Sequence, residues 1–315
     1  MIDAFVIAIQ VGLMYVPLIF GIYISMGVLS LPDFTMQGSF GIGGAVCAVL
    51  LLDGANPTVA LIAAMAAGAL TGLVTATLHL WLQLNVLLAS ILVAAASYSM
   101  ALVIMGRGNM PLAGAATVFD WFTERGLTKQ QSTICAGIFI TVTLGVALTL
   151  FMRTRYGVSL VATGQNIQTA RGLGIRTESR QAVGLGIGNG LAAVSGALIV
   201  QNQGFMDVTI QNGIIVIGLA GMMVGLSIVR THRISLIVGG LILGVIIYRF
   251  VVAMALQFGV SPNMVQMITA VLVVVVVWAR NNGGNLHRLF TTQGRTSLRI
   301  NQSRFYEEDR VASFF

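Results

Sequence analysis

The residues best suited to chemistry in this chain of 315 residues lie in one polar stretch, from Arg153 to Arg180. It carries five arginines and a single acid, Glu178, between two long apolar runs. Because arginine-rich loops stay on the cytoplasmic side of a membrane, this loop is predicted to be cytoplasmic. Within it, apolar residues recur at roughly helical spacing and glycines mark the turns, which predicts a short amphipathic helix. Such a helix is suited to binding a partner protein in the cytoplasm.

The sequence contains no constellation for catalysis. The three histidines are far apart, and no carboxylate pair or metal-ligand spacing falls inside an apolar run. Cys47 and Cys135 both lie in apolar runs, so they form neither a disulfide framework nor a Cys/His metal cluster. The net charge of +7 comes from dispersed loops and a tail, without a compact basic domain for nucleic acid. The sequence therefore predicts no enzyme, no cofactor and no metal site.

A second set of polar residues lies within or beside the apolar runs. The uncharged side chains that could face a permeation path are Thr35, Gln37, Asn85, Asn189, Thr209, Gln211 and Asn212. A path without charge suits rapid release of a solute, so a separate capture protein would have to supply affinity. Each side chain could instead form an interhelical hydrogen bond, worth about 0.6 kcal/mol on average. Arg249, the ionisable residue at membrane depth, is interpreted as an arginine whose head reaches the interface beside Tyr248.

The elements that must position these residues are membrane-spanning helices. Apolar residues make up 57% of the chain and charged residues 9%, with a mean hydropathy of +0.91. Apolar runs of about 20 residues or more are long enough to cross a bilayer. They predict an all-α polytopic membrane protein with about nine helices, near residues 4–29, 36–52, 57–78, 84–105, 132–152, 182–204, 213–229, 234–256 and 263–279. Small residues four apart, such as Gly68/Gly72 and Gly240/Gly244, predict close helix packing.

The chain divides into a transmembrane domain, residues 1–280, and a polar basic tail, residues 281–315. The 153–180 loop and the tail are both predicted to be cytoplasmic, which places the N-terminus outside. The loop from Gly106 to Gln131 then falls on the outer face although it carries Arg107, Arg125 and Lys129, a conflict with the same rule. The tail is expected to lie against anionic lipid headgroups, with a partner-binding element as the alternative.

A weak internal repeat links the two halves. The residues Asp33-Phe34-Thr35-Met36-Gln37 resemble Asp207-Val208-Thr209-Ile210-Gln211, and each copy precedes a glycine-containing apolar run. The predicted topology puts the copies on opposite faces, as an inverted repeat requires. Chance similarity within a biased composition is the alternative. The segment from Ser30 to Ser39 could also be re-entrant.

At the stretch TRYGVSLVATGQNIQTARGLGI, residues 154–175, the sequence resembles the permeases of ATP-binding-cassette (ABC) importers. The resemblance is to the branched-chain amino acid and sugar permease superfamily, which has a type II fold. Within it, the chain is most similar to permeases of tryptophan or tyrosine importers, through DFTMQGSF (33–40), LLASILVAAASYSMALVIMGRGNMPL (87–112) and IGLAGMMVG (217–225). In that superfamily the loop forms coupling helices that dock on an ATPase. The resemblance implies that the coupling contact is made by Arg155, Gly157, Gly164, Asn166, Ala170, Leu173 and Gly174. Headgroup anchoring is the alternative role for Arg155.

The resemblance implies the permease subunit of an ATP-driven importer in the bacterial inner membrane. Its expected partners are two ABC ATPase subunits, a second permease copy in a homodimer, an extracytoplasmic substrate-binding protein and membrane lipid. The solute would be an amino acid or a related small polar molecule. Three alternatives remain open: an ion-coupled secondary transporter, a channel or scaffold, and a membrane-embedded enzyme.

Overall fold

The computed structural model describes residues 2–229, 231, 233–261, 264–265, 267–275 and 278. Within that part, eight helical segments are long and apolar enough to span a membrane. They contain α1 (Ile2–Ile22), α2 (Thr35–Leu52), α3 (Pro57–Leu80), α4 (Val86–Met105), α6 (Lys129–Arg153), α9 (Thr177–Gln203), α10 (Ile214–Ile228) and α11 (Ile234–Gln257). The predicted all-α polytopic fold is confirmed. The ninth predicted helix lies partly outside the described residues, and 267–275 are helical. The tail, 281–315, lies wholly outside them.

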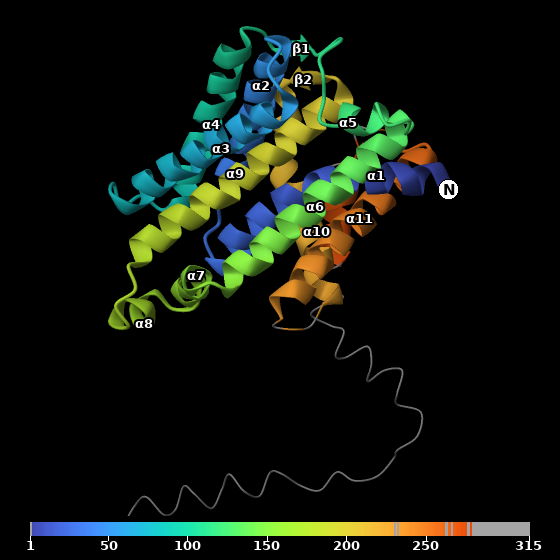
Figure 1. Cartoon of the computed structure of the whole chain (residues 1–315). Coiled ribbons are helices and arrows are strands. Elements are labelled where there is room, and N and C mark those ends of the chain that lie inside the picture. The colour runs from blue at the N-terminus through green and yellow to red at the C-terminus, as the bar shows by residue number, and fades with distance from the viewer. Residues whose placement is uncertain are drawn as a thin grey trace, which may run out of the picture. The chain divides into compact units, whose positions relative to one another are not determined.

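Successive spans run in alternating directions, which separates two ends of the helical bundle (Figure 1). One end carries the short helices α7 (Arg155–Gln165) and α8 (Ile167–Gly172). The opposite end carries α5 (Asp120–Thr123) and a two-stranded antiparallel sheet of β1 (Asn109–Pro111) and β2 (Phe205–Asp207). The basic loop from Gly106 to Gln131 therefore lies at the end away from α7 and α8, as the span count predicts.

Local chemistry sets the ends of the helices. The Asn56 side chain accepts a hydrogen bond from the Thr58 amide and Pro57 follows it, which starts α3. Thr128 and Gln131 form a capping box at the start of α6. Gly204 ends α9 in the left-handed conformation that glycine adopts without strain. α9 begins at Thr177 and not near residue 182, so the last part of the predicted loop belongs to a span.

α1 departs from regular helix at two places. Pro17 lies inside it and cannot donate a hydrogen bond to the Leu13 carbonyl. That carbonyl instead accepts a hydrogen bond from the Thr141 hydroxyl of α6 at 3.4 Å. Side chains of neighbouring helices satisfy proline-freed backbone groups in this way inside membranes. The chain then continues as a π-helix, η1 (Tyr23–Val28). This π-helix forms the last part of the first span and packs on α7.

The turn between η1 and α2 buries Leu29, Leu31 and Asp33 and exposes Ser30 and Pro32. α2 follows as a full 18-residue span, so a re-entrant segment is not needed. α9 is the most buried span and packs on α1, α2 and α3. A Cβ at Gly68 or Gly72 of α3 would overlap α9, because the helices touch there through their backbones. Gly240 and Gly244 of α11 meet α10 in the same manner. Close contact at the predicted small-residue positions is thus confirmed.

Candidate functional site

The polar loop forms two helices and not one. Thr154 starts α7 by accepting a hydrogen bond from the Gly157 amide at 3.1 Å. Asn166 interrupts the helix in an extended conformation and starts α8 by accepting one from the Thr169 amide at 2.9 Å. The break turns the chain, and Gly174, at φ +78°, makes the turn into α9.

One face of α7 is held against the membrane domain. Leu160 and Thr163 are fully buried, and α7 packs on α6, α9 and η1. Gly164 lies directly against the Val28 carbonyl at the end of η1, where any Cβ would overlap that oxygen. Gly157 makes a similar approach to the end of α6. Glycine at these two positions therefore lets α7 sit against the spans.

Polar contacts tie the pair α7–α8 to the first turn of α9. The Arg171 guanidinium of α8 donates to the Thr177 hydroxyl at 3.0 Å and forms an ion pair with Glu178. The Tyr156 hydroxyl of α7 donates to the Ser179 carbonyl at 3.2 Å, and Arg180 lies 3.7 Å above the same ring. These contacts connect a movement of either short helix to the first turn of α9.

The pair also carries exposed apolar side chains. Val158, Ile167 and Leu173 are 58%, 39% and 74% exposed. Of the seven predicted coupling residues, Arg155, Asn166, Leu173 and Gly174 are exposed, Gly164 is half-buried, and Gly157 and Ala170 are buried. The buried ones support the helices from within. Val158 and Ile167 are apolar residues of the same polar loop, and an apolar side chain in such a loop is the signal that could have added them.

A buried polar network joins α2, α3 and α9 near the end that carries α7. The Asn189 amide of α9 donates to the Asp33 carboxylate and accepts from the Ser39 hydroxyl, both at 2.6 Å. The hydroxyls of Thr35 and Thr75 share a hydrogen bond of 2.6 Å between α2 and α3. Asp33, Ser39 and Asn189 are fully buried. Asp33 was not predicted to be a buried carboxyl. An acidic residue just before a membrane span is typical of a helix cap exposed to solvent.

The two copies of the internal repeat have the same local geometry. Asp33 accepts a hydrogen bond from the Thr35 amide at 2.9 Å, and Asp207 accepts one from the Thr209 amide at 2.8 Å. The copies lie at opposite ends of the bundle, since successive spans alternate (Figure 1). Burial raises the pKa of Asp33, whereas the hydrogen bonds from Thr209 lower the pKa of Asp207. One motif thus supplies a fully buried carboxyl and a half-buried one.

The predicted path residues fall into three groups. Thr35 and Asn189 belong to the buried network. Asn85 is exposed and caps α4 at the end that carries α7, and Thr209 and Asn212 are exposed at the opposite end. Gln37 is half-buried, and Gln211 is buried with its Oε1 unpaired among the described residues. Their role in permeation stays a prediction.

Arg249 differs from its predicted position. Its guanidinium lies 3.9 Å above the ring of Tyr15 of α1, and that ring stacks in turn on Phe40 of α2. The Nε and Nη2 atoms are buried without hydrogen-bond partners in the described part of the chain. The arginine therefore points into the bundle and not to the interface, because an aromatic face attracts the cation there.

Among the residues that the structure describes, no group of three histidines, cysteines or acids could hold a metal ion.

The fold is that of a multi-pass α-helical membrane protein with a helix pair projecting at one end. The chain belongs to the family of branched-chain amino acid transport system permease components, which it matches over residues 5–277. The predicted recognition is thus confirmed.

Two relatives support this membership, and one solved structure shares the fold. The chain is 31% identical, over 90% of its length and 92% of the relative's, to a tyrosine transport system permease protein of Clostridioides difficile (strain R20291). It is 27% identical to the autoinducer 2 import system permease protein LsrC of Escherichia coli (strain K12 / DH10B), over 55% of this chain and 49% of LsrC. A solved chain, described as a metal-chelate type ABC transporter in an inward-facing conformation, has the same fold at 13% identity. The TM-score is 0.50, with 87% of this chain and 84% of that chain covered.

Proposed function

We propose that this chain is the permease subunit of an ATP-driven importer and forms the translocation path for an amino acid. Two copies would enclose the path, with two ABC ATPases on the cytoplasmic side and a binding protein on the outer side, in a bacterial inner membrane. Family membership and the names of the relatives, a tyrosine permease and an autoinducer importer, support this assignment. Similarity to the tyrosine permease favours an aromatic amino acid as the solute.

The observation that carries the proposal is the exposed apolar face of α7 and α8. Three large apolar side chains, Val158, Ile167 and Leu173, lie on this helix pair beside the exposed Arg155. Burial of apolar side chains gives a docking contact its affinity, and an exposed arginine at its rim can pair with an acid of the partner. This face is the proposed ATPase contact, and its end of the bundle is the cytoplasmic one.

The contacts behind that face provide a route for mechanical coupling. Closure of the ATPase dimer would displace α7 and α8 as one body. Arg171 and Tyr156 would transmit the displacement to α9, and Gly164 would transmit it to η1. α9 holds Asn189, so the movement reaches the network that joins α2, α3 and α9.

Co-purification from the native membrane tests the docking face. Leu173→Glu places a charge in the proposed contact, and Leu82→Glu is its matched control. Leu82 is 60% exposed at the same end of the bundle, in the turn between α3 and α4. An ABC ATPase should co-purify with wild type and with the Leu82 variant, and be lost from the Leu173 variant. Equal recovery with both variants contradicts the assigned face, and no ATPase with any of them contradicts the proposed function.

An ion-coupled secondary transporter is the second candidate. The buried Asp33 carboxyl and the inward-pointing Arg249 favour it, because ion-coupled carriers keep ionisable groups within their spans. The importer remains first, because ion coupling offers no role for the exposed face of α7 and α8. Uptake that an ionophore abolishes and that survives ATP depletion would reverse this order.

A further inference from the structure

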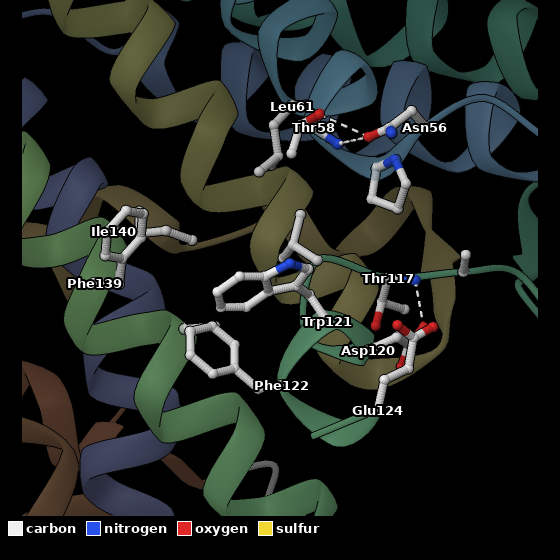
Figure 2. Close-up of a pocket in the computed structure, with 14 residues that line it drawn as sticks. Asn56, Thr58, Leu61, Thr117, Asp120, Trp121, Phe122, Glu124, Phe139 and Ile140 are labelled. Atoms are coloured by element: carbon white, nitrogen blue, oxygen red, sulfur yellow. Dashed lines mark hydrogen bonds between the residues drawn. The ribbon is translucent and has the colours of Figure 1, made fainter. Parts of the chain in front are cut away.

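Two adjacent cavities lie at the end of the bundle that carries β1 and β2. The larger, of about 760 Å³, opens between α3, α5 and α6 (Figure 2). The smaller, of about 310 Å³, lies between the loop after β1, the start of α6 and the end of α9. Thr117 and Asp120 line both. The volumes fall in the range of small-molecule sites, roughly 300 to 1,000 Å³.

The larger cavity is apolar at one end and acidic at the other. Figure 2 shows Trp121 in its middle, with Phe122 and Phe139 toward one side and Asp120 and Glu124 toward the other. Trp121 and Phe122 meet edge to face, with ring centroids 4.7 Å apart, and the Arg125 guanidinium covers one face of the Trp121 ring at 3.2 Å, which leaves the other face for a ligand. Aromatic walls of this kind bind another ring by edge and stacking contacts. A flat aromatic group therefore fits the apolar end.

The smaller cavity carries one charge of each sign. Lys129, the first residue of α6, and Asp120 both line it. The Asp120 Oδ2 accepts a hydrogen bond from the Thr117 amide at 2.6 Å, which leaves its other oxygen available. Among the described residues, Asp120 and Lys129 do not form an ion pair with each other or with any other residue. The cavity thus presents an anion and a cation that could each bind an opposite charge.

Hydrogen bonds hold the loop that lines both cavities. The Gln201 side chain of α9 accepts from the Val118 amide at 2.8 Å and donates to the Cys47 sulfur at 3.3 Å. Asn202 accepts a hydrogen bond from Gln10 at 3.0 Å. The loop that carries Asp120 is therefore tied to α9, whose side chains are in turn bonded to α1 and α2, as a preformed site requires.

We propose that the two cavities together bind the zwitterion of an aromatic amino acid. Lys129 binds the carboxylate, Asp120 binds the ammonium group, and the ring lies against Trp121 in the larger cavity. The assignment rests on the proposed function, in which this end of the bundle faces outward and the solute is an aromatic amino acid. The cavities would then hold the solute before it enters the path.

Direct binding to the purified full chain in lipid-free detergent tests the site. The probe is radiolabelled tyrosine, measured by scintillation proximity, with three unlabelled competitors. Phenylalanine should compete well. Tyramine lacks the carboxylate and 4-hydroxyphenylpropionate lacks the ammonium group, so each should compete at least about tenfold less well, because each loses one charged contact.

Variants locate the site on the molecule. Lys129→Gln and Trp121→Leu should each weaken tyrosine binding by about tenfold or more. Trp81→Leu is the matched control, since Trp81 is exposed in the α3–α4 turn at the opposite end of the bundle. Its affinity should equal that of wild type. Both altered side chains are exposed, so folding should survive, and an unchanged gel-filtration profile checks this.

Three results overturn the assignment: no tyrosine binding by wild type, unchanged binding by Lys129→Gln, or displacement of tyrosine by phosphatidylethanolamine alone and not by phenylalanine. The last would make the occupant a lipid, which also carries an ammonium group and an anion next to an apolar part. Uptake assays keep the two proposals apart. ATP-driven uptake without direct binding refutes only this site, whereas binding without an ATPase partner refutes the importer.

Discussion

Replacement of Asn189 by alanine should destabilise the protein mainly because the buried Asp33 carboxyl then lacks a hydrogen-bond donor. In Asn189→Ala, the Asp33 Oδ2 loses its donor at 2.6 Å while the carboxyl remains fully buried. A buried acceptor left without a partner costs about 1 to 3 kcal/mol. The other partner loses less, because the Ser39 hydroxyl keeps the Thr35 carbonyl as an acceptor at 3.2 Å.

A double-mutant cycle isolates this cost. In an Asp33→Ala background the same Asn189→Ala change orphans no carboxylate, so the two changes should not add. The coupling free energy should be about 1 to 3 kcal/mol, roughly 5- to 150-fold in the unfolding equilibrium. An ordinary interhelical hydrogen bond gives only about 0.6 kcal/mol on average. The four proteins would be unfolded with sodium dodecyl sulfate in mixed micelles and followed by circular dichroism.

The chain supplies a matched control cycle. Asn109 donates to the Asp207 carboxylate at 3.1 Å between β1 and β2, with the same chemistry in a hydrogen bond that is exposed to solvent. Coupling there should be below about 0.5 kcal/mol, because solvent replaces the lost partner. If the buried cycle is additive within about 0.5 kcal/mol as well, burial of Asp33 does not give the network its strength, and the reasoning fails.

Three further results are expected from the proposed coupling elements. Gly164→Ala should push α7 away from η1 and reduce ATPase capture and uptake, whereas Gly172→Ala, with open space around it, should leave both unchanged. Equal effects of the two substitutions would show that the close packing of Gly164 is not what matters. Arg171→Ala should keep the ATPase bound but lower uptake per ATP hydrolysed, with a stability change below about 1 kcal/mol because its ion pair with Glu178 is exposed; a wild-type ratio of uptake to hydrolysis would count against the route through α9. Arg249→Met should resist detergent unfolding at least as well as wild type, because it removes a buried charge whose Nε and Nη2 lack partners in the described structure; a clearly lower unfolding midpoint would show that stacking on Tyr15 outweighs the burial cost.

The fold class and most span positions could be predicted from the sequence, because the bilayer imposes a length and a hydropathy on each helix. The close-packing glycines could be predicted as well, since their spacing places them on one helix face. The start of α9 was misplaced, because the polar residues at Thr177 and Glu178 read as loop and tertiary contacts with Arg171 extend the helix. Local hydropathy does not contain those contacts.

What the sequence alone determined is which residues are chemically available: an arginine-rich loop, a set of uncharged polar side chains and two Asp-x-Thr motifs. The tertiary structure decided how each is used. It buried Asp33 fully against Asn189 and left Asp207 half-buried, although the two share a local motif. It turned Arg249 inward onto Tyr15, and it brought Asp120 and Lys129 into one cavity without pairing them. Burial and the direction of a side chain depend on helices distant in the sequence, so no local pattern could have predicted them.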